Sequence, residues 1–214
     1  MSGAKDATIA ETYKDRINAL RNGGGRKILG IVGPPGCGKS TLAAALLELL
    51  GDDAVAVPMD GYHLANVELA RLGRAGRKGA EDTFDSAGYV SLLRRLKEQQ
   101  ANEIVYAPEF RREIEEPIAN AIPVFPDTQL VITEGNYLLL DHGHWAGVSE
   151  LLDEIWYVDI DHSVRRERLV KRHMHFGRSQ SAAEDWVANT DEPNAVRIEA
   201  TKHRADVLFN WEGE

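Results

Sequence analysis

The sequence predicts an α/β fold in which helices cover both faces of a mainly parallel central sheet, as in a three-layer sandwich. Short apolar runs with the length of strands alternate along the chain with segments of helical periodicity, and this alternation is typical of parallel sheets. The length of 214 residues suffices for one sizeable core and favours a single domain, residues 1–214. Ligands of such sheets bind beyond the carboxyl ends of the strands.

The first expected elements run from the N-terminus to residue 60. Apolar side chains at helical spacing over residues 8–22 predict a leader helix, and the glycines that follow it end a leader region at residues 1–26. The next elements are a strand over residues 27–33, a helix over 40–50 closed by a glycine, and a second strand over 54–60.

The remaining elements complete the alternation. A loop rich in glycine and arginine is expected first, and it is followed by helices and strands in turn. These segments are the loop 71–85, a helix through 89–100, strands at 121–125 and 129–140, a strand at 154–160, a cationic helix at 163–176, helices around 181–189 and 194–203, and a strand near 205–210.

Composition excludes several classes of protein. A net charge of −9 argues against a duplex-binding protein, so we expect no nucleic-acid partner. The single cysteine, Cys37, cannot form an intrachain disulfide and fits a reducing compartment. The N-terminus is charged where a signal peptide is apolar, and no apolar run could span a bilayer. These observations predict a cytoplasmic protein without a membrane partner.

The segment 33–40, GPPGCGKS, fits the phosphate-binding pattern G-x-x-x-x-G-K-[ST] and lies between an expected strand and an expected helix. The backbone amides and the positive end of the helix would hold the phosphates of ATP. Lys39 is expected to reach the β/γ-phosphates and Ser40 to hold Mg²⁺. The fold is therefore expected to be a P-loop NTPase sandwich. The nucleotide-binding residues would be Gly33, Gly36, Cys37, Gly38, Lys39, Ser40 and Thr41.

Among nucleotide enzymes the sequence favours a kinase of small molecules. The element by which GTPases select guanine is missing its lysine in the nearest match, residues 189–192. Arg165, Arg168 and Arg172 follow the helical spacing i, i+3 and i+7 and so share one helix face. Such a helix, in a lid region at residues 161–183, could close over the transferring phosphoryl group. The alternative is a solvated basic face in an acidic protein.

Seven segments carry a resemblance to a known family: GPPGCGKST, MDGYHL, RKGAEDTFD, YAPEFRR, ITEGNYLLL, RRERLVKRH and DEPNA. Together they resemble the uridine kinase, pantothenate kinase and phosphoribulokinase group of P-loop kinases. Within that group the sequence is most similar to the bacterial fructose-transport-system kinases. The likeness runs from about residue 27 to nearly the C-terminus.

The resemblance implies a role for Asp60, which follows the second strand. The matching aspartate takes or orients the proton of the acceptor hydroxyl, as a carboxylate at that place can. The alternative is that Asp60 caps a helix over residues 61–72. Glu134, at the end of a strand, is expected to hold Mg²⁺, through a water, or to contact a substrate hydroxyl.

The resemblance also implies an acceptor pocket and a contact with the nucleotide base. The acceptor residues would be Tyr62, His63, Asp82, Phe84, Asp85, Phe110, Arg112 and Asn136, in addition to Asp60 and Glu134. Asn194 would lie at the base or cap a helix. Related sequences tend to read aromatic-Asp-Arg where this chain has Phe110-Arg111-Arg112. This departure either changes the hydrogen bonding of the segment or indicates an acceptor of anionic character.

We therefore expect an ATP- and Mg²⁺-dependent kinase that phosphorylates an alcohol on a small metabolite, with a sugar such as fructose as the first candidate. Asp60, Lys39, Arg168 and Arg172 would be the catalytic residues. A nucleoside or pantothenate-type acceptor is the alternative within this class, and an ATP-binding regulator is the alternative outside it. The sequence is compatible with a homodimer as well as with a monomer.

Overall fold

The computed structural model describes residues 9–211, and its centre is a five-stranded parallel sheet. The strands are β1 (Lys27–Val32), β2 (Ala54–Ala56), β5 (Leu130–Gly135), β6 (Glu154–Val158) and β7 (Val207–Phe209). Their order across the sheet is β2-β5-β1-β6-β7, and every neighbouring pair is parallel. The predicted fold class is confirmed.

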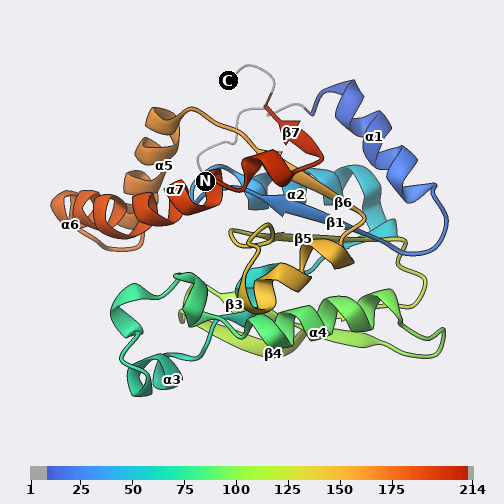
Figure 1. The fold of residues 1–214 in the computed structure, drawn as a ribbon, viewed down its shortest axis with the longest axis horizontal. Coiled ribbons are helices and arrows are strands. Elements are labelled where there is room, and N and C mark those ends of the chain that lie inside the picture. Colours follow the sequence, from blue (N-terminus) through green and yellow to red (C-terminus); the bar gives the residue numbers. More distant parts are fainter. Residues whose placement is uncertain (1–8, 212–214) are drawn as a thin grey trace.

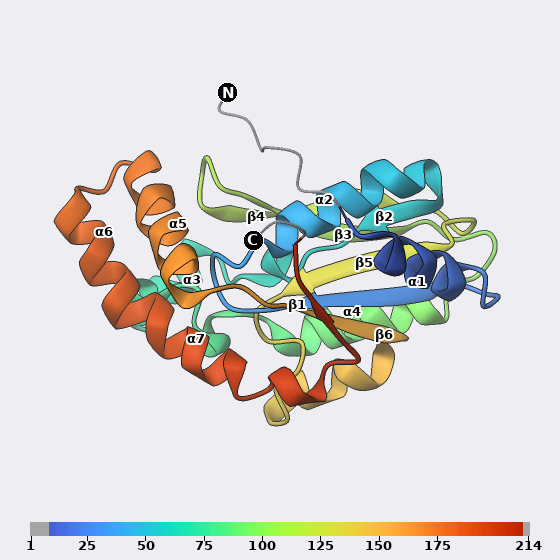
Figure 2. The same cartoon turned by 90° about the horizontal axis from the view of Figure 1, so that it is seen from above.

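Helices lie on both faces of this sheet (Figures 1 and 2). One face carries α1 (Glu11–Arg21) and α2 (Lys39–Leu50), and the other carries α4 (Ser86–Lys97). Each interface has its own buried apolar cluster, because the buried parallel strands present apolar side chains to both faces. The part of the leader region before residue 9 lies outside the described residues.

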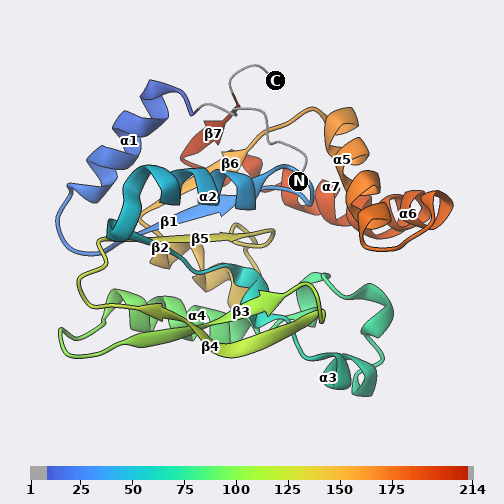
Figure 3. The ribbon, with the colours of Figure 1, turned by 180° about the vertical axis from the view of Figure 1, so that it is seen from behind.

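A separate antiparallel pair, β3 (Val105–Arg111) and β4 (Glu116–Val124), lies on the α4 side (Figure 3). The sequence predicts only a short strand at 121–125 and no strand at 105–111. The reason is that Pro108, Pro117 and Pro123 interrupt the apolar pattern. Pairing is irregular between Ala107 and Glu109. This hairpin brings residues 110–115 to the same side of the molecule as the phosphate-binding segment.

The C-terminal helices form an arm at one end of the sheet (Figure 2). They are α5 (His162–His175), α6 (Gln180–Trp186) and α7 (Glu192–Glu199), with a π-helical turn at Val187–Asp191 joining the last two. The gap expected between helices at 181–189 and 194–203 is therefore absent over these described residues. The short helix α3 (Asn66–Arg71) lies across from the arm (Figure 1).

Two expected strands are shorter than predicted. The strand expected at 54–60 ends at Ala56, because Pro58 has no N–H group for a ladder and residues 59–62 form a 3₁₀ turn. The strand expected at 129–140 ends at Gly135, and Leu140 donates a hydrogen bond to the Tyr137 carbonyl in a buried turn. Both shifts place polar side chains at the carboxyl edge of the sheet. Over residues 9–211, no helix is long and apolar enough to cross a bilayer.

Candidate active site

A cavity of about 510 Å³ lies beyond the carboxyl ends of β1, β2 and β5, between the C-terminal arm and the β3–β4 hairpin. Four segments that are far apart in sequence contribute its walls: the phosphate-binding segment, the turn after β2, the hairpin tip and the arm. The predicted site residues that line it are Gly36, Lys39, Ser40, Asp60, His63, Phe84, Phe110, Arg112, Glu134, Asn136, Arg172 and Asn194.

The phosphate-binding segment is supported directly by α5. Gly36 has a φ of +83°, and a Cβ there would lie 2.7 Å from Leu169 Cγ and 3.2 Å from the Arg165 carbonyl oxygen. Only glycine fits both the left-handed backbone and this close approach. The segment is thereby fixed to the base of the arm.

Lys39 lies along the inside of the loop. Its ammonium donates hydrogen bonds to the carbonyls of Gly33 at 2.9 Å and Pro34 at 3.2 Å, and the side chain is buried. Cys37 is also buried, and burial raises the pKa of its thiol. The side chain of Cys37 therefore packs into the protein, while the Lys39 ammonium stays beside the cavity.

Ser40 and Glu134 form the candidate metal position. The Ser40 hydroxyl donates a 2.8 Å hydrogen bond to Glu134 Oε1, and the sheet register sets Glu134 beside Ile31, two residues before Gly33. Burial and then the Asp60 charge raise the pKa of Glu134, although Lys39 opposes this. A buried carboxyl beside a serine hydroxyl, with a second carboxyl acting on it, fits a divalent cation that bound phosphates would also ligate.

Asp60 faces the same cavity from the turn after β2. Its Oδ2 lies 3.4 Å from Arg112 Nη2 at the hairpin tip. Asp60 lies within a 3₁₀ turn at Met59–Tyr62, and the N-cap position of α3 is Ala65, so the alternative role of Asp60 as a helix cap is wrong. Gly61 permits this placement, because a Cβ there would lie 2.3 Å from the Pro108 carbonyl oxygen.

Three rings form one wall of the cavity. The His63 ring lies between Phe84, at a centroid distance of 4.0 Å, and Phe110, at 4.6 Å. Burial lowers the pKa of His63, and the charges of Lys78 and Arg112 act in the same direction against that of Asp60. His63 Nδ1 lies 2.8 Å from the Asp60 carbonyl oxygen. The wall is therefore uncharged at neutral pH and is attached to the turn that carries Asp60.

The three predicted arginines of α5 do not all line the cavity. Arg172 lines the cavity, and burial followed by the charge of Arg112 lowers the pKa of its guanidinium. Arg165 is 1% exposed, forms an ion pair with Glu192 and donates to the Pro35 carbonyl. The expectation that Arg165 faces the phosphoryl group is wrong, since it joins α5 to the phosphate loop and to α7. Arg168 is exposed and is not among the cavity-lining residues.

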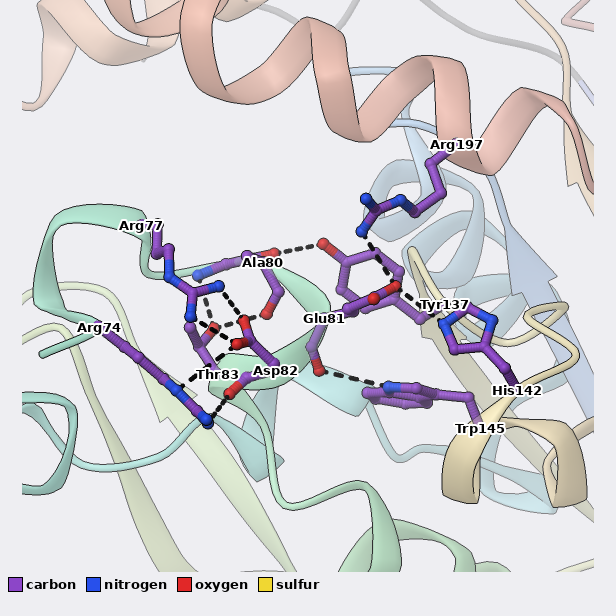
Figure 4. Close-up of polar contacts among 11 residues, drawn as sticks. Arg74, Arg77, Ala80, Glu81, Asp82, Thr83, Tyr137, His142, Trp145 and Arg197 are labelled. Carbon is purple, nitrogen blue, oxygen red and sulfur yellow. Dashed lines mark hydrogen bonds and ion pairs between the residues drawn. The ribbon is translucent and has the colours of Figure 1, made fainter. Parts of the chain in front are cut away.

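Three predicted acceptor residues lie outside the cavity lining. Tyr62 packs on Tyr89 with a ring centroid distance of 5.5 Å, and burial raises its pKa to about 12. Asp85 caps α4 by accepting a hydrogen bond from the Gly88 amide. Asp82 accepts hydrogen bonds from Arg77 and forms an ion pair with Arg74 (Figure 4). Local capping and loop closure explain these acids without a ligand. Gly33, Gly38 and Thr41, with Cys37, are the other predicted residues that do not line the cavity.

The segment around Glu81 is attached to two other parts of the molecule (Figure 4). Tyr137 donates a hydrogen bond to the Gly79 carbonyl at 2.5 Å, and Trp145 donates one to the Glu81 carbonyl at 3.3 Å. The Glu81 carboxylate lies 3.2 Å from Arg197 of α7. The loop that borders the acceptor end of the cavity is thus anchored to the core and to the arm.

Comparison with known proteins places this geometry in a family. The model of the phosphoribulokinase/uridine kinase family matches residues 28–213. The chain belongs to the phosphoribulokinase/uridine kinase family. It is a P-loop kinase, and its fold and its phosphotransferase class follow from that membership.

Individual members of the family cover most of the chain. A candidate uridine kinase of Schizosaccharomyces pombe is 35% identical over 197 residues, which are 88% of this chain and 83% of that protein. The protein YggC of Escherichia coli K12 is 32% identical over 194 residues, which are 88% of this chain and 79% of YggC. The crystal structure of a candidate fructose transport system kinase from Silicibacter has a TM-score of 0.84 and 36% identity, and covers 94% of this chain and 98% of its own.

The cavity of this family member contains residues that the sequence analysis did not assign to the site. His173 of α5 and Asp191 of the π turn pair at 2.8 Å, and Arg178 stacks on Trp186 with 3.8 Å between Cζ and the ring centroid. His173 ends the segment RRERLVKRH and Asp191 begins DEPNA, but the pair is not predicted from these segments because the two residues come together only when the arm folds. The unpredicted lining residues are Pro35, Asn66, Ala75, Lys78, Gly79, Glu115, His173, Phe176, Arg178, Trp186, Thr190 and Asp191. Over residues 9–211, no group of three or more histidine, cysteine, aspartate or glutamate residues is placed to hold a metal ion.

Proposed function

We propose that this kinase transfers the γ-phosphoryl group of ATP, as its Mg²⁺ complex, to a hydroxyl of a small metabolite, with a sugar as the first candidate. One observation carries the proposal. The carboxylate of Asp60 faces the same cavity as Lys39, Ser40 and Glu134, so a hydroxyl acceptor and a phosphoryl donor can meet there.

The donor would lie on the phosphate loop. Backbone amides from Gly36 to Thr41 bind the phosphates, and Lys39 exchanges its carbonyl contacts for phosphate oxygens. Ser40 and Glu134 would hold Mg²⁺, which when bound offsets phosphate charge. Asn194, at the arm side of the cavity, is the proposed contact for the nucleotide base.

The acceptor would lie between Asp60 and the ring wall. The acceptor oxygen forms a bond to the γ-phosphorus as the bond to the oxygen of ADP breaks, and the hydroxyl proton passes to the Asp60 carboxylate. Arg172 then stabilises charge on the phosphoryl oxygens, and movement of α5 toward the phosphates excludes water. Arg168 would contribute only after such a movement, because it does not line the cavity.

Acceptor-dependent release of ADP tests the proposal. Purified protein is given MgATP with sugars, nucleosides, pantothenate and hydroxy acids in turn, and ADP is followed by a coupled assay. One acceptor class is expected to stimulate turnover at least about tenfold over basal hydrolysis, because only a bound alcohol supplies the nucleophile. Tight ATP binding with no stimulation by any acceptor would favour the ATP-binding regulator instead.

A further inference from the structure

The acceptor end of the cavity carries a guanidinium that the phosphoryl donor does not require. Two consecutive arginines end β3 and begin the hairpin turn. Arg111 is not among the cavity-lining residues and pairs with Glu109 at 2.7 Å, whereas Arg112 lines the cavity beside Asp60. The fold therefore neutralises one cation locally and presents the other to the ligand.

Most of the hydrogen-bonding capacity of Arg112 is unused within residues 9–211. Its guanidinium has five N–H donors, and the 3.4 Å contact with Asp60 is its one hydrogen bond there. The charge of Arg112 nevertheless acts across the cavity: it contributes to the lowered pKa of Arg172 and, more weakly, to that of His63, and it opposes the rise in the pKa of Glu134. A planar guanidinium with free donors matches the paired oxygens of a carboxylate or a phosphate group.

The other charges on this wall leave Arg112 available. Lys78 donates a 2.6 Å hydrogen bond to Asn66 Oδ1 and another to the Glu115 carbonyl, and its ammonium lies 5.2 Å from the Phe110 ring centroid. On this wall of the cavity, two carboxylates are among the lining residues: Asp60 and Glu115. Burial lowers the pKa of Lys78, and the charges of Glu116 and then Glu115 oppose this shift, so carboxylates of the hairpin partly offset the Lys78 ammonium.

The contact with Arg112 engages the carboxylate of Asp60 before an acceptor binds. The Arg112 guanidinium lies 3.4 Å from Asp60 Oδ2, within reach of a hydrogen bond. A neutral sugar could not remove the guanidinium from Asp60. An anionic group could do so, because it offers Arg112 a stronger partner than a single long contact.

We propose that the acceptor is an anionic alcohol: a small hydroxylated metabolite whose carboxylate or phosphate group binds Arg112 while its hydroxyl meets Asp60. This inference rests on the proposed function and narrows its acceptor class. Binding of the anion draws the guanidinium from Asp60, and the freed carboxylate takes the hydroxyl proton. The acceptor is compact, since the two side chains that hold its ends are in contact.

Matched acceptor pairs test the inference. Each pair differs in charge: fructose with fructose 6-phosphate, and glycerol with glycerate or glycerol 3-phosphate. The last two members separate a carboxylate from a phosphate source. A charged member is expected to give kcat/KM at least about tenfold above that of its neutral partner, which is the effect of one charge-assisted hydrogen bond of about 1.5–3 kcal/mol.

Two neighbouring arginines provide the variant and its control. Arg112→Gln is expected to raise the KM of the charged acceptor at least about tenfold and to leave the KM of ATP within about twofold. Arg111→Gln removes the same charge one residue away, outside the cavity, and is expected to match the wild type. Both side chains are about half exposed, at 46% for Arg112 and 55% for Arg111, so neither change removes buried packing.

Calorimetric binding of the same compounds in the presence of a non-hydrolysable ATP analogue completes the design. Stimulation by neutral members as strongly as by charged ones overturns the inference and leaves the proposed function intact. An equal effect of Arg112→Gln on both members of a pair also overturns it. If no acceptor stimulates ADP release, the proposed function fails. The inference is then tested by the calorimetric Kd values alone, and charged members that bind no more tightly than neutral ones overturn it.

Discussion

Single side chains in the cavity owe their charge states to their immediate surroundings. His63 stays uncharged because its burial between two phenylalanine rings lowers its pKa more than the nearby Asp60 raises it, and the cations Lys78 and Arg112 act in the same direction as burial. Glu134 shows the opposite case, in which burial raises a carboxyl pKa. Both groups depend on the folded site, so both connect its electrostatics to stability.

We predict that His63 makes the free energy of unfolding fall on acidification. Its pKa is lower in the folded state than the unfolded value of about 6.5, so the unfolded chain binds the proton first. The stability it contributes is present above about pH 6.5 and is lost as the pH falls through the folded pKa. Urea unfolding at about pH 7 and about pH 5 measures this loss, which should be smaller in His63→Phe. Equal losses in both proteins would contradict the assignment.

Among the contacts between elements, the one between α5 and the phosphate loop leaves little room for a larger side chain. Gly36 meets Leu169 and the backbone of Arg165 on this helix, and Arg165 in turn bonds the loop carbonyl of Pro35. The base of the arm therefore shapes the loop. A change in the position of α5 would therefore alter the shape of the phosphate loop, so we expect the proposed movement of α5 to affect nucleotide binding.

We predict that Gly36→Ala weakens ATP binding and destabilises the fold. The substitution adds a clash at 2.7 Å to the cost of a left-handed backbone at φ +83°. Gly73→Ala is the matched control, because its φ is +67° but a Cβ meets nothing within 4 Å. Gly36→Ala should lose about 1–3 kcal/mol more of unfolding free energy than the control. Equal losses would show that α5 does not restrain the loop.

The elements differ in how well the sequence alone predicts them. Strand β1 and helix α2 follow from an apolar run and a phosphate motif that are both local, and the parallel sheet follows from their alternation with other segments. Strand β3 is not predicted, because prolines and charges hide its pairing with β4. The His173–Asp191 pair is not predicted either, since its members are separated by 18 positions and meet only through the π turn.

Across the whole molecule, the cavity is assembled from parts that belong to opposite sides. The arm contributes Arg172 and Asn194, and the acceptor side contributes Asp60 and the hairpin tip. Glu81 and Arg197 connect these sides directly through one ion pair (Figure 4). Because Arg197 is 51% exposed, solvent screens this ion pair. The pair is therefore expected to hold the two sides in position while adding little to the free energy of unfolding.

We predict a small coupling between Glu81 and Arg197. A double-mutant cycle of Glu81→Gln and Arg197→Gln should give an interaction energy of about 0.2–1 kcal/mol in urea unfolding, and this energy should decrease with added salt. A value near zero at low salt would mean that the two sides of the cavity are not joined through this pair. The sum of such weak links is what we expect to set how freely the arm moves.

The charge distribution of the whole chain also agrees with its class. The molecule has a net charge of −9, yet the cavity is lined by Lys39, Lys78, Arg112, Arg172 and Arg178. The composition alone predicts an acidic protein, and only the fold gathers these cations from the loop, the hairpin and the arm. Asp60, Glu115, Glu134 and Asp191 line the same cavity, so its lining has a formal charge of +1 in an acidic chain, which favours the binding of phosphates.

The central claim is that Asp60 prepares the acceptor and does not bind ATP. The most direct measurement compares Asp60→Asn with the wild type in acceptor phosphorylation and in ATP binding, with Asp141→Asn as an exposed control outside the cavity. The account predicts a loss of about a hundredfold or more in acceptor-dependent kcat, with the Kd of ATP within about twofold. Equal loss of both quantities, or full activity in Asp60→Asn, would contradict it.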